Sequence, residues 1–281
     1  MRLILLALLA LLALFIAGNS VMAAGLEKVR ITSLAKDRSH INGYLLRPAG
    51  TDPFPAVVAL HGCSGLWRSK GGALSSRHAD WGNRLRKAGY VVLFPDSFGS
   101  RGQKSLCKIK KRPVKHSHRV GDIRGAADWL AAQPFVDGGK LALLGWSNGA
   151  SSLLRSLAPD KAPATTDYKT AIGFYPGCRT LVQKTSWRPR IKLFILMGAD
   201  DDWTPPEPCN QLASRWGARI VLYKGAYHGF DAPDSRLRVL KGRAYSTRGD
   251  GIVYIGTNPR ARRAAINEVM AHLKSVFASV Q

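Results

Sequence analysis

Short apolar runs alternate with helix-like segments along the chain from residue 29 onward. Two of these runs, residues 57–60 and 141–144, contain only apolar residues instead of alternating apolar with polar ones. A continuous run is typical of a strand in a parallel sheet whose two faces are both covered by helices. The strands that we expect cover residues 29–34, 41–47, 56–60, 91–95, 140–144, 171–175, 191–197 and 219–223.

The segments between these strands repeat their apolar residues at helical spacing. In the last segment Val269, Leu273 and Val276 recur three or four residues apart and would form one apolar face. The predicted helices cover residues 79–87, 120–132, 148–157, 207–216 and 260–278. Strands that alternate with helices indicate an α/β fold with a mostly parallel, eight-stranded sheet and helices on both faces.

Two segments interrupt this alternation. Residues 101–119 contain eight Lys or Arg and no acidic residue, and we expect them to form a loop. Residues 231–258 are rich in Arg, Gly and Ser and are expected to be irregular. Neither segment is predicted to be a linker between domains, so we expect residues 25–281 to form one domain.

The N-terminal segment has the pattern of a secretory signal peptide. Met and Arg are followed by fifteen uncharged residues, 3–17, and then by small residues at 21–24. We therefore expect residues 1–24 to be removed and the mature chain to be secreted or periplasmic. An uncleaved membrane anchor is the alternative, although the run is shorter than the roughly 20 residues that span a bilayer. No second long apolar run follows it, so no membrane span is expected after cleavage.

The composition is globular, with 46% hydrophobic and 21% charged residues. The 42 basic and 18 acidic residues give a net charge of +24. Such a charge attracts anions and acidic surfaces, or it is a general property of the chain with no specific partner. Nucleic acid is not an expected partner, because the chain is expected to be exported and contains no recognisable nucleic-acid-binding module.

Four cysteines, an even number in an exported chain, favour two disulfides, and three pairings are possible. Their spacing matches no zinc-binding pattern. His116 and His118 form a lone His-x-His in the basic segment, which we interpret as part of a solvated loop and not as a metal site.

The strongest local motif is Gly145-Trp146-Ser147-Asn148-Gly149, which directly follows an expected strand and opens an expected helix. Gly-x-Ser-x-Gly in that setting is typical of a nucleophile elbow, a sharp turn that raises the serine hydroxyl above the edge of the sheet. Ser147 is therefore the candidate nucleophile. A serine hydroxyl becomes reactive only when a neighbouring base removes its proton.

Two later segments can supply the base and the acid. Aspartates occupy positions 200–202, after the strand expected at 191–197, and His228 follows the strand expected at 219–223. Serine, then an aspartate near 201, then histidine is the chain order of α/β-hydrolases and differs from the orders of other serine-protease folds. We interpret these residues as a catalytic triad.

A glycine-rich turn, His61-Gly62-Cys63-Ser64-Gly65, ends the strand expected at 56–60. The oxygen of a tetrahedral intermediate needs preorganised N–H donors, one after the nucleophile and one from this earlier loop. The backbone N–H groups of Cys63 and Asn148 are the candidates for this oxyanion hole.

These motifs resemble those of the dienelactone hydrolase family within the α/β-hydrolases, and the resemblance covers nearly the whole mature chain. The family's acid lies three residues after a glycine and four before a proline, here Gly198 and Pro205, which implies Asp201. The resemblance implies neither a metal nor an organic cofactor. It also rests on residues 43–48, 95–101 and 227–231.

The chain departs from the family's founding enzymes in two ways. Those enzymes carry Cys at the elbow and Glu before the oxyanion-loop glycine, where this chain has Ser147 and His61, so it resembles a serine-bearing branch. Arg101 matches an arginine that binds the substrate carboxylate in those enzymes, whereas a second such arginine has no counterpart here. The match at Arg101 suggests an anionic substrate.

The resemblance also implies how the cysteines pair. In this fold the strands that precede Cys63 and Cys107 are neighbours, and so are the strands that precede Cys178 and Cys209. The implied disulfides are therefore Cys63–Cys107 and Cys178–Cys209.

Together these features predict an exported serine hydrolase that cleaves a small-molecule carboxylic ester or lactone through an acyl-enzyme on Ser147. Trp146, Trp203 and Tyr175 are the candidates for lining the acyl pocket. One alternative is a non-catalytic basic binding protein on the same fold, against which the complete triad argues. Another is a peptidase or acyltransferase that uses the same triad.

Overall fold

The computed structural model describes residues 25–50, 53–68 and 72–279. The signal peptide expected at residues 1–24 lies outside these described residues. Within them, no helix is both long enough and apolar enough to cross a membrane.

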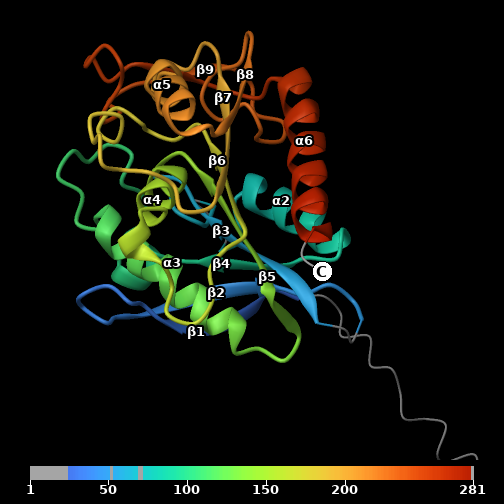
Figure 1. The fold of residues 1–281 in the computed structure, drawn as a ribbon. Coiled ribbons are helices and arrows are strands. Elements are labelled where there is room, and N and C mark those ends of the chain that lie inside the picture. Colours follow the sequence, from blue (N-terminus) through green and yellow to red (C-terminus); the bar gives the residue numbers. More distant parts are fainter. Residues whose placement is uncertain (1–24, 51–52, 69–71, 280–281) are drawn as a thin grey trace, which may run out of the picture.

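An eight-stranded sheet forms the centre of the protein, in the order β1-β2-β4-β3-β5-β6-β7-β8 (Figure 1). β2 is antiparallel to both of its neighbours, and every other pair in the sheet is parallel. The predicted mostly parallel, eight-stranded sheet is thus confirmed. The strands are β1 (Glu27–Thr32), β2 (His40–Leu46), β3 (Phe54–Leu60), β4 (Val91–Pro95), β5 (Val136–Trp146), β6 (Thr170–Phe174), β7 (Lys192–Gly198) and β8 (Arg219–Tyr223).

Helices cover both faces of this sheet (Figure 1). α2 (Ser76–Lys87) and α6 (Pro259–Ala278) lie on one face, and α3 (His116–Ala131), α4 (Asn148–Ser156) and α5 (Glu207–Trp216) lie on the other. Because both faces are covered, β4 and β6 are buried at every position, which explains why β4 is apolar throughout and β6 is apolar after Thr170. Two short 3-10 helices occupy Gly99–Arg101 and Pro159–Lys161.

Two segments expected to be irregular contain secondary structure. α3 begins at His116, four residues earlier than predicted, and His118 Nδ1 accepts a hydrogen bond from the Lys115 N–H at its start. This first turn is polar, so apolar periodicity does not reveal it. Within residues 231–258, β9 (Arg238–Leu240) and β10 (Val253–Ile255) form a separate antiparallel pair, each strand too short to show a pattern.

The parallel strands direct their carboxyl ends to one edge of the sheet. Cys63 follows β3, Ser147 follows β5, Asp201 follows β7 and His228 follows β8. Residues widely separated in the sequence are therefore gathered at this edge, where open α/β sheets place their ligands.

Two disulfides are present, Cys63–Cys107 and Cys178–Cys209, the same pairs that the family resemblance implies. The first joins the glycine-rich turn after β3 to the basic segment before α3. The second joins the segment after β6 to α5. Both therefore fasten loops at the edge of the sheet that carries Ser147.

Candidate active site

Ser147 lies in a sharp turn between β5 and α4, with φ 51° and ψ −114°. A positive φ is unfavourable for a residue with a Cβ atom, and such strain persists only where the surroundings impose it. The flanking glycines permit the turn. A Cβ atom at Gly149 would lie 2.2 Å from Leu60 O, and one at Gly145 would lie 2.9 Å from Ala150 N.

Asp201 and His228 are joined by a 2.8 Å hydrogen bond between Oδ2 and Nδ1, and both are buried. The carboxylate is fixed by further donors. The backbone N–H groups of Trp203 and Thr204 donate to Oδ1 at 2.9 and 2.8 Å, and the Thr204 hydroxyl donates to Oδ2 at 3.0 Å. The spacing rule that selects Asp201 among three aspartates therefore leads to the residue that contacts His228.

The His228 ring is held between aromatic side chains. The ring centroids of Tyr175 and Trp203 lie 4.5 and 4.8 Å from its own. Among the described residues no hydrogen bond joins the Ser147 hydroxyl to His228. Catalytic hydrogen bonds are often long in unliganded enzymes and shorten when substrate binds.

The two candidate oxyanion donors lie on adjacent segments. Asn148 is the first residue of α4, so its N–H has no acceptor within the helix. A Cβ atom at Gly62 would lie 3.6 Å from Ser147 Cβ, which places the turn that carries Cys63 directly against the elbow. Within the described part of the chain, the Cys63 N–H has no protein acceptor.

A buried arginine that the sequence did not reveal connects these two segments. Arg119 donates to Asn148 Oδ1 at 2.7 Å and to His61 O at 2.8 Å, and it is fully buried. Burial lowers the pKa of its guanidinium to about 9. Arg119 thus fixes the elbow and the glycine-rich turn relative to each other.

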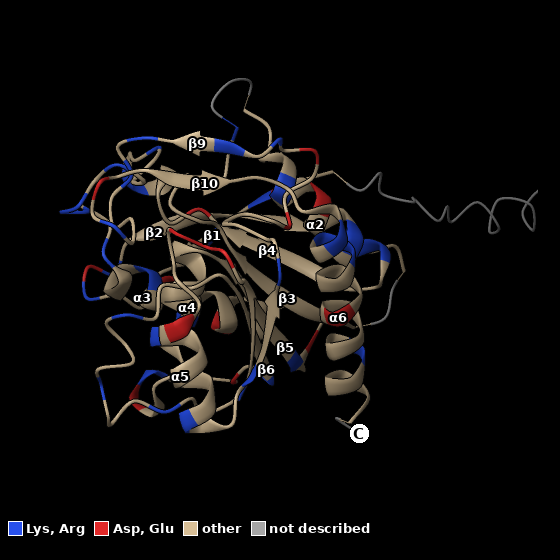
Figure 2. Cartoon of the chain, turned by 90° about the horizontal axis from the view of Figure 1, so that it is seen from above, with Lys and Arg blue, Asp and Glu red and all other residues tan. Residues whose placement is uncertain are grey.

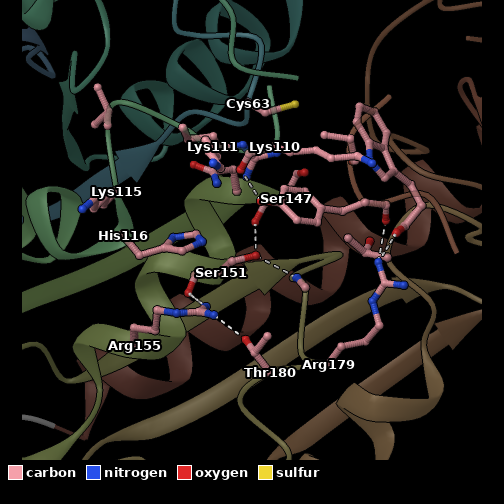
Figure 3. A pocket seen from close by; sticks show the side chains of 18 residues that line it. Cys63, Lys110, Lys111, Lys115, His116, Ser147, Ser151, Arg155, Arg179 and Thr180 are labelled. Atoms are coloured by element: carbon pink, nitrogen blue, oxygen red, sulfur yellow. Dashed lines mark hydrogen bonds between the residues drawn. The ribbon is translucent and has the colours of Figure 1, made fainter. Parts of the chain in front are cut away.

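A cavity of about 700 Å³ opens beside Ser147 (Figure 3). Its lining includes the predicted residues Cys63, Asn148 and Trp203. Among the described residues, six cationic side chains line it, and no Asp or Glu does. These are Lys110, Lys111, Arg112, Lys115, Arg155 and Arg179.

Arg101, expected to bind the substrate carboxylate, does not line this cavity. Its guanidinium donates to both carboxylate oxygens of the buried Asp122, at 2.9 and 2.8 Å, and to Ser39 Oγ. A guanidinium already paired in this way is not available to a substrate. The expectation for Arg101 is therefore corrected to a structural ion pair.

Trp146 and Tyr175 also lie outside the lining of the cavity. Both are buried, and each donates to Asp231, Trp146 through its indole N–H at 2.8 Å and Tyr175 through its hydroxyl at 2.5 Å. Asp231 accepts two more hydrogen bonds, from Trp81 and Arg77. These two aromatic residues therefore belong to a buried hydrogen-bond network centred on Asp231, and not to an acyl pocket.

Replacement of Asp231 by Asn should destabilise the fold, because the amide would turn a donor toward groups that are themselves donors. Removing one member of a buried charge pair costs about 3–5 kcal/mol. We expect Asp231→Asn to lower the free energy of unfolding by about this amount in urea denaturation. The matched control is Asp250→Asn, at an exposed ion pair with Arg248. Equal urea midpoints for the two variants would contradict the role given to Asp231.

Among the described residues, no group of three or more His, Cys, Asp or Glu side chains is arranged to hold a metal ion. His116 instead lies beside the cavity, with Nδ1 2.7 Å from Ser152 Oγ. Burial lowers the pKa of His116 to about 2, so its ring is neutral at pH 7.

Comparisons with known proteins agree with this architecture. The model of the dienelactone hydrolase family matches residues 41–277. A putative dienelactone hydrolase from Klebsiella pneumoniae has 17% sequence identity and a TM-score of 0.63, covering 89% of this chain and 99% of the other. A dienelactone hydrolase-like promiscuous phosphotriesterase from metagenomic libraries has 19% identity and a TM-score of 0.65, covering 90% and 99%. At these identities the two structures establish the fold alone.

A curated relative, a probable dipeptidyl-aminopeptidase B from Uncinocarpus reesii, is 27% identical over 169 residues. The match covers 56% of this chain but only 18% of that much longer protein. The family match over residues 41–277 confirms the resemblance inferred from the sequence motifs, and the structural neighbours confirm the α/β-hydrolase fold.

Proposed function

The chain belongs to the dienelactone hydrolase family and is a hydrolase, and on that premise we propose that it is an exported serine hydrolase of carboxylic esters or lactones. The observation that carries the proposal is the buried 2.8 Å hydrogen bond between Asp201 and His228, at the sheet edge that also carries the strained Ser147. The substrate enters the cavity beside Ser147.

In the proposed mechanism Ser147 Oγ attacks the carbonyl carbon of the ester, and His228 Nε2 takes the hydroxyl proton. Asp201 holds the Nδ1–H tautomer and stabilises the imidazolium that forms. The Cys63 and Asn148 N–H groups stabilise the oxyanion. His228 then gives its proton to the leaving alkoxide. In the second step His228 deprotonates a water molecule that attacks the acyl-enzyme, the bond to Ser147 Oγ breaks, and Ser147 Oγ takes the proton back from His228 as the acid is released.

Export is part of the proposal. The described cysteines are all paired, and disulfides persist in oxidising compartments such as the periplasm or the extracellular space. The charged start and short apolar run of residues 1–24 support the same location.

Peptidase action is the second candidate, supported by the likeness to a probable dipeptidyl-aminopeptidase. An aminopeptidase substrate carries a free ammonium group, which an acidic side chain usually binds. The described residues that line the cavity beside Ser147 include six cationic side chains and no acidic one. Repulsion between like charges therefore favours ester substrates over peptides with a free amino terminus.

A substrate panel tests the proposed function. We expect the mature protein to hydrolyse p-nitrophenyl acyl esters and to leave dipeptidyl p-nitroanilides intact. The dependence on acyl chain length would measure the size of the acyl site. Turnover of the anilides with none of the esters would replace the esterase proposal with the peptidase one.

A further inference from the structure

The arginines of the cavity beside Ser147 have no carboxylate partner among the described residues. Arg155 donates to Ser151 O at 2.8 Å and to Thr180 Oγ1 at 2.6 Å. Arg112 donates to Leu106 O, and Arg179 donates to the carbonyl oxygens of Trp203 and Tyr245. Neutral oxygens orient these three guanidinium groups without neutralising their charge.

Two of these arginines are partly removed from water. Burial lowers the pKa of Arg112 and of Arg155, which means that the surroundings disfavour their charged forms. An anion in the cavity would relieve this cost, because it would supply the missing opposite charge. Arg155 lies on α4, and its guanidinium contacts the carbonyl of Ser151, one helical turn beyond Ser147 (Figure 3). A bound anionic group at Arg155 would therefore lie at least about 5 Å, one helical pitch, from Ser147.

A second cavity, of about 890 Å³, adjoins the first and shares Lys115, His116 and Arg155 with it. It is basic as well. Its further cationic residues are Lys36, Arg124, Lys161 and Lys184. Asp160, the acidic residue in its lining, is already paired with Lys161.

Basic residues occur elsewhere on the molecule, including α2 (Figure 2), but several of those arginines are neutralised locally. Arg84 and Arg262 both pair with Asp80, and Arg219 pairs with Glu268. The two adjoining cavities differ from these ion-paired sites because their cationic side chains greatly outnumber their acidic ones. A high overall charge alone does not explain this local imbalance.

We propose that the two adjoining cavities together bind one acidic oligosaccharide chain, and that this chain carries the ester cleaved at Ser147. The cavity beside Ser147 holds the esterified unit and its nearest negative charges, and the second cavity holds charges farther along the chain. This inference rests on the proposed esterase function for the reaction, and on the cationic linings for the binding.

The chemistry of the two cavities favours a sugar chain over other polyanions. Hydroxyl and carboxyl groups of acidic sugars form carboxylic esters, which the backbones of nucleic acids and peptides lack. Sites for single-stranded nucleic acid combine a basic groove with exposed aromatic platforms for the bases. Of the Trp and Tyr side chains that line the two cavities, Trp187 and Trp203 are buried and donate their indole N–H groups to Leu154 O and Ala244 O. Tyr245, in the first cavity, is exposed, and the Arg112 guanidinium lies over its ring. One exposed ring does not form the row of platforms on which successive bases stack.

Calorimetric titration with galacturonate oligomers tests this proposal on the mature protein. These probes carry no ester, so they report binding independently of catalysis. We expect the hexamer to bind at least about tenfold more tightly than the monomer at low salt, and added salt to weaken it. The Lys36→Glu/Lys184→Glu variant changes two exposed residues of the second cavity and should weaken hexamer binding by about tenfold or more.

The matched control is Lys87→Glu/Lys274→Glu, which makes the same change of charge at exposed positions of α2 and α6, on the other face of the sheet. Equal weakening in both double variants would overturn the proposal, because it would reveal an effect of net charge. Equal affinity for monomer and hexamer would also overturn it. Tighter binding of a DNA hexanucleotide than of the galacturonate hexamer would overturn the assignment to a sugar chain.

The titration and the ester assay together distinguish this inference from the proposed function. Tight hexamer binding by a protein that hydrolyses none of the p-nitrophenyl esters would support the binding site and refute the esterase. Ester turnover without preferential hexamer binding would support the esterase and overturn the oligosaccharide site. Urea denaturation of each double variant establishes that a loss of binding is not a loss of folding.

Discussion

Replacement of Ser147 by alanine should lower kcat for p-nitrophenyl esters by about 10⁴- to 10⁶-fold. The variant keeps the oxyanion donors and the Asp201–His228 pair but has no hydroxyl to form an acyl-enzyme. The residual rate would come from water attacking a bound and polarised substrate. KM should change little, because the Ser147 hydroxyl contributes mainly to the reaction step and little to substrate binding.

Steady-state kinetics of purified Ser147→Ala beside the parent protein measures this effect. Ser275→Ala is the matched control, since it removes an exposed serine hydroxyl from α6 on the other face of the sheet. If Ser147→Ala retained more than about a tenth of the parent rate, another nucleophile would carry the reaction.

Replacement of Asp201 by asparagine should lower kcat by about 10⁴-fold with little effect on folding. Asp201 Oδ1 accepts from two backbone N–H groups, so the asparagine carbonyl would keep those bonds and turn its amide toward His228. An amide donor facing Nδ1 would favour the tautomer that carries its proton on Nε2. In that tautomer His228 cannot accept the proton of the Ser147 hydroxyl.

The adjacent aspartate provides the control for this substitution. Asp200 is exposed, so Asp200→Asn makes the same chemical change one residue away and should leave kcat within about twofold. Comparable losses in the two variants would contradict the assignment of the triad acid to Asp201.

The positions of the three residues of the proposed triad could be predicted from the sequence because each depends on local signals. Ser147, Asp201 and His228 each follow an apolar strand, and parallel strands bring their carboxyl ends to one edge of a sheet. The pattern therefore predicted which residues would approach one another. Strand existence was also predictable, since the central strands are buried on both faces and read as unbroken apolar runs.

The side chains that surround the site depend on contacts between distant segments, which the sequence pattern does not encode. Trp146 was expected in an acyl pocket, but its indole N–H is bound by Asp231, 85 residues away. Arg101 was expected to face substrate, but Asp122 neutralises it. Similarly, Arg155 meets the basic segment before α3 only after folding, so its place in the cavity was not visible from spacing.

Covalent trapping tests the proposed role of Ser147 most directly. The mature protein is treated with diisopropyl fluorophosphate, which phosphorylates activated serine hydroxyls, and is then examined by intact-protein and peptide mass spectrometry. We predict one diisopropylphosphoryl group, located on Ser147, with loss of ester hydrolysis in proportion to labelling and no adduct in Ser147→Ala. Full ester hydrolysis by a protein that stays unlabelled, or an inactivating adduct on another residue, would contradict the account.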